Sequence, residues 1–146
     1  MDQQNYECSI AAEFTPEEAF EAIGRVNEWW AKNIEGSAEK LNNIFTVRFP
    51  GETSVTFKIT ESVPNEKIAW LVTDCFLPWL KDKTEWTGTT VVFEIASLGE
   101  ETHVTMTHIG LVPGIECYEG CEAGWDKYFK GSLFKLLTEH AGAPLA

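Results

Sequence analysis

The imidazole of His108 is the side chain in this sequence best suited to acid–base chemistry. It follows Val104 and Met106 at two-residue intervals, in a stretch where apolar and polar residues alternate. Alternate side chains of a strand point to the same face, so His108 is predicted to face inward with these apolar neighbours. An inward histidine could transfer a proton or orient a ligand, because its pKa is easily moved across neutrality. A core histidine bonded to other protein groups is the more common alternative.

These two alternatives predict different effects of the substitution His108→Leu. If His108 lines a pocket, as we expect, the variant should keep its stability and lose ligand binding. If the partner of the imidazole is a buried protein group, the variant should lose about 1–3 kcal/mol of stability.

Two carboxylates are spaced so that they would lie on the same inner face as this imidazole. Glu85 is an even number of residues before Val91 and would point to the same side, unless Gly88 introduces a bulge. Asp74 continues the face of Trp70. A carboxylate beside an imidazole can form an acid–base pair, but carboxylates at strand ends are usually only solvated. We therefore treat both as candidate ligand-binding residues and predict no catalytic residue.

Cys117 and Cys121 suggest a zinc site, because they would share one helix face downstream of His108. Structural zinc sites need four ligands, and no fourth ligand is evident. We therefore expect neither metal nor cofactor, and thiols that face the pocket. The four cysteines of the chain are predicted to be reduced, since no secretory signal precedes them.

Aromatic residues are the remaining candidates for the lining of a pocket, because a flat ring with one polar group suits ligands of mixed polarity. Ordinary core packing is about as frequent for each of them, and for Trp125 it is preferred. The candidates are Trp70, Trp86, Tyr118 and Trp125.

The elements that must position these residues follow from hydrophobic periodicity. A strand is predicted over 6–14, and Thr15-Pro16-Glu17-Glu18 is typical of a capped helix start. Gly24 is expected to divide that helix into two short ones. Period-two strands follow, with inward residues Phe45, Val47, Phe49, Val55, Phe57, Ile59, Ile68, Trp70, Val72, Val91, Phe93, Ile95, Val104, Met106 and His108.

The longest predicted element is a helix from about Glu116 to His140, in which apolar residues recur at helical intervals. A strand, two short helices, a run of strands and one long helix imply an α+β domain spanning residues 1–146. Its curved antiparallel sheet wraps around the C-terminal helix, and a cavity can remain between them.

The formal net charge of −12 excludes some partners. A negative surface field repels phosphate backbones and anionic lipid headgroups, so we expect no nucleic acid and no membrane as partners. No apolar run approaches the length needed to cross a bilayer, and the N-terminal residues lack the pattern of a signal peptide. We expect a cytoplasmic protein. The sequence also lacks a nucleophile elbow and both Gly-rich phosphate-binding motifs.

Several segments together resemble the START-like SRPBCC superfamily with its helix-grip fold, and most closely its branch of activator of heat-shock protein 90 ATPase homologues. The resemblance covers nearly the whole chain, from Tyr6 to about Gly142. It implies a fold with a pocket, but it does not specify one reaction. The segments are Phe20 to Trp30, Glu85-Trp86-Thr87-Gly88-Thr89 with the strand to Ile95, Thr105 to Leu111, Gly124-Trp125 and Ser132-Leu133.

Three functions remain open, and we rank them in this order. The first is binding of a small apolar or aromatic ligand in the cavity between the sheet and the C-terminal helix. The second, implied by the resemblance, is a co-chaperone-like interaction protein with a chaperone as partner. The third is a cyclase- or hydrolase-type enzyme that uses His108. The sequence does not fix the oligomeric state.

Overall fold

The computed structural model describes residues 6–30, 33–36, 38, 40–48, 53–76, 86–110 and 125–139. Seven strands form one antiparallel sheet in the order β1-β7-β6-β5-β4-β3-β2. The strands are β1 (Tyr6–Ala12), β2 (Ile34–Gly36), β3 (Ile44–Arg48), β4 (Ser54–Val63), β5 (Lys67–Phe76), β6 (Thr90–Leu98) and β7 (Glu101–Ile109). The helices are α1 (Pro16–Gly24), α2 (Val26–Trp29), the π-helical η1 (Asp126–Leu133) and α4 (Phe134–Glu139).

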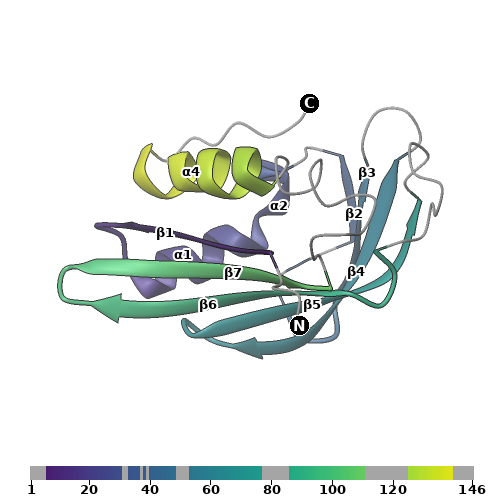
Figure 1. Cartoon of the computed structure of the whole chain (residues 1–146), viewed down its shortest axis with the longest axis horizontal. Helices are drawn as coiled ribbons and strands as arrows, with labels where there is room; N and C mark the ends of the chain where they lie inside the picture. The colour runs from purple at the N-terminus through teal and green to yellow at the C-terminus, as the bar shows by residue number, and fades with distance from the viewer. Residues whose placement is uncertain are drawn as a thin grey trace, which may run out of the picture.

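The sheet is curved, and the C-terminal helix lies across it (Figure 1). α1 contacts β6 and α4, while α2 and β1 contact η1. A hydrogen bond joins β1 to this helix: the Tyr6 hydroxyl donates to Asp126 Oδ1 over 2.5 Å. The α+β helix-grip arrangement expected from the sequence is confirmed. The predicted helical residues 116–124 and 140 lie outside the described residues.

The start and the end of α1 agree with the sequence signals. The Thr15 side chain accepts a hydrogen bond from the Glu18 backbone, and the Glu18 carboxylate accepts one from the Thr15 backbone, each over 3.0 Å. This reciprocal capping box satisfies two backbone donors that the helix itself leaves unpaired. The helix ends at Gly24, as predicted, and α2 begins two residues later.

Asp74 does not lie on the inner face that the sequence parity predicted. β4 and β5 change register where Thr56 pairs with Asp74 and Phe57 pairs with Val72. Thr73 is therefore an extra residue in β5, a bulge that moves every later side chain to the opposite face. Asp74 is exposed on the outer face as a result.

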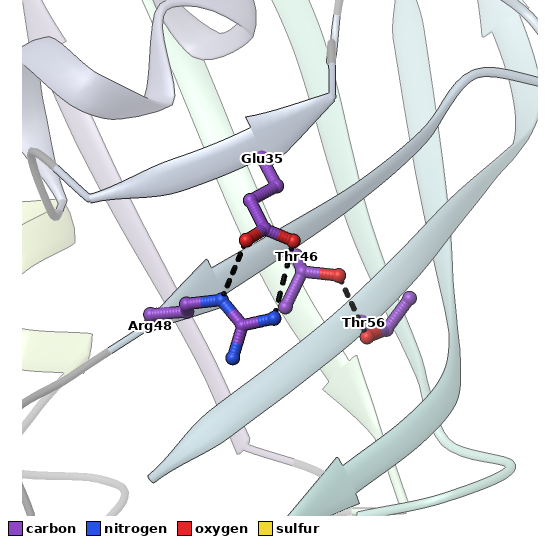
Figure 2. Close-up of polar contacts among 4 residues, drawn as sticks. All are labelled: Glu35, Thr46, Arg48 and Thr56. Atoms are coloured by element: carbon purple, nitrogen blue, oxygen red, sulfur yellow. Dashed lines mark hydrogen bonds and ion pairs between the residues drawn. The ribbon is translucent and has the colours of Figure 1, made fainter. Parts of the chain in front are cut away.

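Polar pairs link the strands on that outer face (Figure 2). Arg48 of β3 donates from Nε and Nη2 to the two carboxylate oxygens of Glu35 in β2, each over 3.1 Å. The hydroxyls of Thr46 and Thr56 lie 2.9 Å apart across β3 and β4. The sequence pattern did not single out β2, whose three residues are too few to establish a period.

Aromatic rings fill the space between the helices and the inner face of the sheet. Trp70 of β5 is fully buried. The ring of Trp30 is stacked on it, with a centroid distance of 6.4 Å and an interplanar angle of 2°. Phe93 of β6 contacts Phe129 of η1 at a centroid distance of 6.0 Å. The other buried aromatic residues of the core are Tyr6, Phe14, Trp29, Phe45, Phe57, Trp86 and Trp125.

Candidate functional site

His108 is the centre of a hydrogen-bonded chain at one end of the interior. It is 0% exposed and shares the inner face of β7 with Val104 and Met106, as the sequence predicted. The indole Nε1–H of Trp125 donates to His108 Nδ1 over 3.1 Å. His108 Nε2 lies 2.9 Å from Thr89 Oγ1, and that hydroxyl lies 2.6 Å from the backbone oxygen of Trp86.

The partners determine which nitrogen carries the proton. An indole nitrogen can only donate, so His108 Nδ1 must accept and the ring proton resides on Nε2. Nε2 then donates to the Thr89 hydroxyl, which donates in turn to the Trp86 carbonyl. Both imidazole nitrogens are therefore occupied by protein groups. Burial lowers the pKa of His108 to about 3, so the ring is neutral near pH 7.

This neutral, buried imidazole should make folding sensitive to acid. The pKa of His108 falls from 6.5 to about 3 on folding, so below pH 6.5 the unfolded chain binds the extra proton. Its contribution to stability is complete above pH 6.5 and is lost progressively as the pH falls towards the folded pKa. The loss is at most about 1.4 kcal/mol per pH unit. The difference in unfolding free energy between wild type and His108→Leu should shrink accordingly between neutral pH and about pH 4, whereas parallel curves would contradict the prediction.

Two indoles flank the imidazole. The rings of Trp86 and Trp125 are stacked, with centroids 6.0 Å apart and an interplanar angle of 9°. Trp86 contacts His108 edge to face, with a centroid distance of 4.6 Å and an interplanar angle of 88°. Trp86 is only 7% exposed, and its Nε1 has no hydrogen-bond partner among the described residues. The same holds for Nε1 of Trp70. A buried donor without a partner costs about 1–3 kcal/mol, so an acceptor at either position would be stabilising.

The structure brings together three of the predicted site residues, Trp86, His108 and Trp125. We call these three residues and Thr89 the tryptophan–histidine cluster. Trp70 lies outside this cluster and reaches it only through Trp30, whose ring centroid is 4.8 Å from that of Trp125. Asp74 lies apart on the outer face. Glu85, Cys117, Tyr118 and Cys121 lie outside the described residues.

Thr89 is the site residue that the sequence analysis missed. Its spacing of two residues from Val91 could have placed it on the inner face, because Val91 lies directly opposite His108 in the pairing of β6 with β7. Gly110 supports its position: a Cβ there would lie 2.6 Å from Thr89 Cγ2, and the residue has φ +106°. A side chain at 110 would therefore push Thr89 away from the imidazole.

The cavity predicted between the sheet and the C-terminal helix stays a prediction, because residues 77–85 and 111–124 lie outside the described residues. Among the described residues of this region, Trp70, His108 and Trp125 are at most 2% exposed. A groove of about 360 Å³ lies elsewhere on the inner side, between α1 and strands β4 and β5. None of the grooves found in the described part of the chain is lined by the tryptophan–histidine cluster.

Thiols and carboxylates do not assemble into a metal site within the described ranges, where no three His, Cys, Asp or Glu residues form a suitable group. Cys8 is a free thiol, and burial raises its pKa to about 11. No helix in the described part of the chain is long and apolar enough to cross a membrane.

A family model described as "Activator of Hsp90 ATPase homolog 1-like protein" matches residues 13–138. A search of curated proteins found no match. Among solved structures, the Aha1 dimer from Colwellia psychrerythraea is similar with a TM-score of 0.74 and 24% identity, over 91% of this chain and 95% of that one. MLL2253 from Mesorhizobium loti has a TM-score of 0.70 and 15% identity, over 94% and 100%. DynU16, a putative protein in the dynemicin biosynthetic locus, has a TM-score of 0.71 and 14% identity, over 97% of this chain and 49% of that one.

Proposed function

The chain belongs to the family of Activator of Hsp90 ATPase homolog 1-like proteins, and from this premise we propose that it binds a small ligand at the tryptophan–histidine cluster. The ligand has an apolar or aromatic body and at least one hydrogen-bond acceptor. No cofactor takes part, and the proposed location is the cytoplasm. Glu85, Cys117, Tyr118 and Cys121 remain proposed contributors to the same site.

The observation that carries this proposal is the buried, unpaired Nε1–H of Trp86. Leaving such a donor without a partner is costly, and a ligand oxygen or nitrogen that accepts from it removes that cost. The ring faces of Trp86 and Trp125 supply apolar area beside the donor. A carbonyl or ether group on an aromatic body fits both features.

An acid–base enzyme is less well supported by the same geometry. General acid–base catalysis needs a titratable group that can reach the proton it transfers. Both nitrogens of His108 already bond to Trp125 and Thr89. The imidazole therefore orients the two indoles and offers no free nitrogen to a substrate.

The proposal predicts that Trp86→Phe weakens binding of an acceptor-bearing ligand about tenfold, because phenylalanine keeps most of the ring area and removes the donor. The probes are 2-acetylnaphthalene, which carries a carbonyl, and 2-ethylnaphthalene, which lacks an acceptor. Titration calorimetry of both probes against wild type and variant measures the effect. Only the ketone should lose affinity.

Trp70→Phe is the matched control, because it removes another unpaired indole N–H from the fully buried centre of the core. This control should leave ketone affinity within about twofold of wild type. Equal binding of ketone and hydrocarbon to wild type, or unchanged ketone binding in Trp86→Phe, would remove the proposed site.

A chaperone-associated role is the second candidate, and family membership is the observation that favours it. The charge of −12 suits a basic surface on a partner protein and would make such binding salt-dependent. Titration of this protein into purified heat-shock protein 90 at low and high salt tests the role. Binding that weakens with salt supports it, and no heat change at low salt contradicts it.

A further inference from the structure

We propose a second binding site for a small amphipathic carboxylate in the groove between α1 and strands β4 and β5, separate from the tryptophan–histidine cluster. The groove measures about 360 Å³, within the range of roughly 300–1,000 Å³ typical of small-molecule sites. We call it the α1 groove. It shares no lining residue with the cluster.

The floor of the α1 groove is apolar. Ala38, Ile59 of β4 and Ile68 of β5 are buried there. Phe20, a partly buried residue of α1 that packs on the core, forms part of the wall, and Gly24 leaves room at the end of the helix. An alkyl chain or a small ring on this floor would lose its contact with water, which is favourable in proportion to the apolar area covered.

The rim of the groove carries positive charge in an otherwise acidic protein. The chain has 11 Lys and Arg residues against 23 Asp and Glu, yet two of the three charged residues that line this groove are cations, Lys40 and Arg25. The exposed Lys40 ammonium forms no ion pair with any residue that the structure describes. An anionic group above the apolar floor would give it a partner.

Arg25 is the second cation, and its two ion pairs are weak. It lies 3.8 Å from Glu21 and 3.8 Å from Glu28, and about half of each of these side chains is exposed. Exposed pairs at such distances contribute little and rearrange readily. The guanidinium can therefore turn towards a ligand without leaving a buried charge behind.

Charge balance limits the ligand to a single negative charge. Glu21 lines the same groove, so the three charged lining residues sum to one net positive charge. The overall charge of −12 opposes a phosphate or another multiply charged anion more strongly than a monoanion. A carboxylate with an apolar tail matches both the floor and the rim.

The test uses octanoate and 1-octanol, which have the same number of carbon atoms and differ in the charge of the head group. Octanoate should bind wild type at low salt, and Lys40→Gln should weaken it about three- to tenfold while leaving 1-octanol unchanged. Lys135→Gln is the matched control, because Lys135 is an exposed lysine of α4 that forms no ion pair within the described part of the chain. Calorimetry or ligand-observed NMR measures both affinities.

Ser62→Leu provides a second, charge-independent variant, because Ser62 lines the groove on β4 and is only partly buried. The larger side chain should reduce binding of octanoate and of 1-octanol alike. If Lys40→Gln and Lys135→Gln weakened octanoate binding equally, the effect would come from the overall charge of the protein, and the proposed site would be wrong. The site would also be wrong if neither Lys40→Gln nor Ser62→Leu changed octanoate binding. Trp86→Phe should not alter octanoate binding, so this proposal can fail or hold independently of the naphthyl ketone site.

Discussion

Leu133→Ala is expected to lower the free energy of unfolding by about 2–5 kcal/mol, because it deletes buried methyl groups and leaves a cavity that the surroundings fill only in part. Leu133 is 0% exposed and lies in η1, one turn from the buried Phe129. The helix grips the sheet through these side chains, so the cavity would open at their seam. Urea unfolding followed by circular dichroism gives the change.

Lys135→Ala is the control for this prediction, since Lys135 is exposed on α4 only two residues away. It should change stability by less than about 0.5 kcal/mol. If the unfolding midpoint of Leu133→Ala equalled that of wild type, the packing of the C-terminal helix on the sheet would be wrong.

His108→Leu is expected to cost about 1–3 kcal/mol of stability, because leucine fills the space but leaves the buried Trp125 N–H without its acceptor. The sequence alone left two outcomes for this variant, and the protein partners on both ring nitrogens favour the destabilising one. Thr89 loses a donor but can still donate to the Trp86 carbonyl. Thermal and urea unfolding at neutral pH measure the loss.

His103→Leu is the matched control on the same strand, since His103 is only partly buried and lies on the opposite face. It should be nearly neutral. If His108→Leu were as stable as wild type, the indole of Trp125 would have to find another acceptor. If that variant also lost affinity for 2-acetylnaphthalene, the imidazole would contribute to ligand binding as the sequence predicted.

Local signals predicted much of the fold. Strand parity placed Val104, Met106 and His108 on the inner face, and the capping residues located the start of α1. Both signals act within a few residues, so neighbouring sequence is sufficient to recognise them. In the structure, Gly99 lies in the two-residue turn between β6 and β7 with a φ of +67°, a backbone conformation that favours glycine.

Contacts between distant segments could not be predicted from local sequence, and they account for the wrong face assigned to Asp74. The bulge at Thr73 depends on how β4 and β5 pair, and nothing in β5 alone reveals it. The size of the expected cavity likewise depends on long-range contacts, such as those of Trp30, just after α2, with Trp70 and with Trp125, just before η1. Side-chain volume is known from sequence, but which chains meet is set by tertiary packing.

The stacked indoles also determine how this protein will behave under light. Five tryptophans form a continuous series in which consecutive ring centroids lie 4.8 to 6.5 Å apart, in the order Trp70, Trp29, Trp30, Trp125 and Trp86. At these separations, excitation energy absorbed by one ring passes to its neighbours before emission. The fluorescence is therefore a property of the coupled indoles together, and a quencher that contacts Trp86 should also reduce the emission that follows excitation of Trp29. The same coupling should give a paired positive and negative band in the circular dichroism of the indole transitions, and the part that involves Trp125 should be lost once the C-terminal helix leaves the sheet.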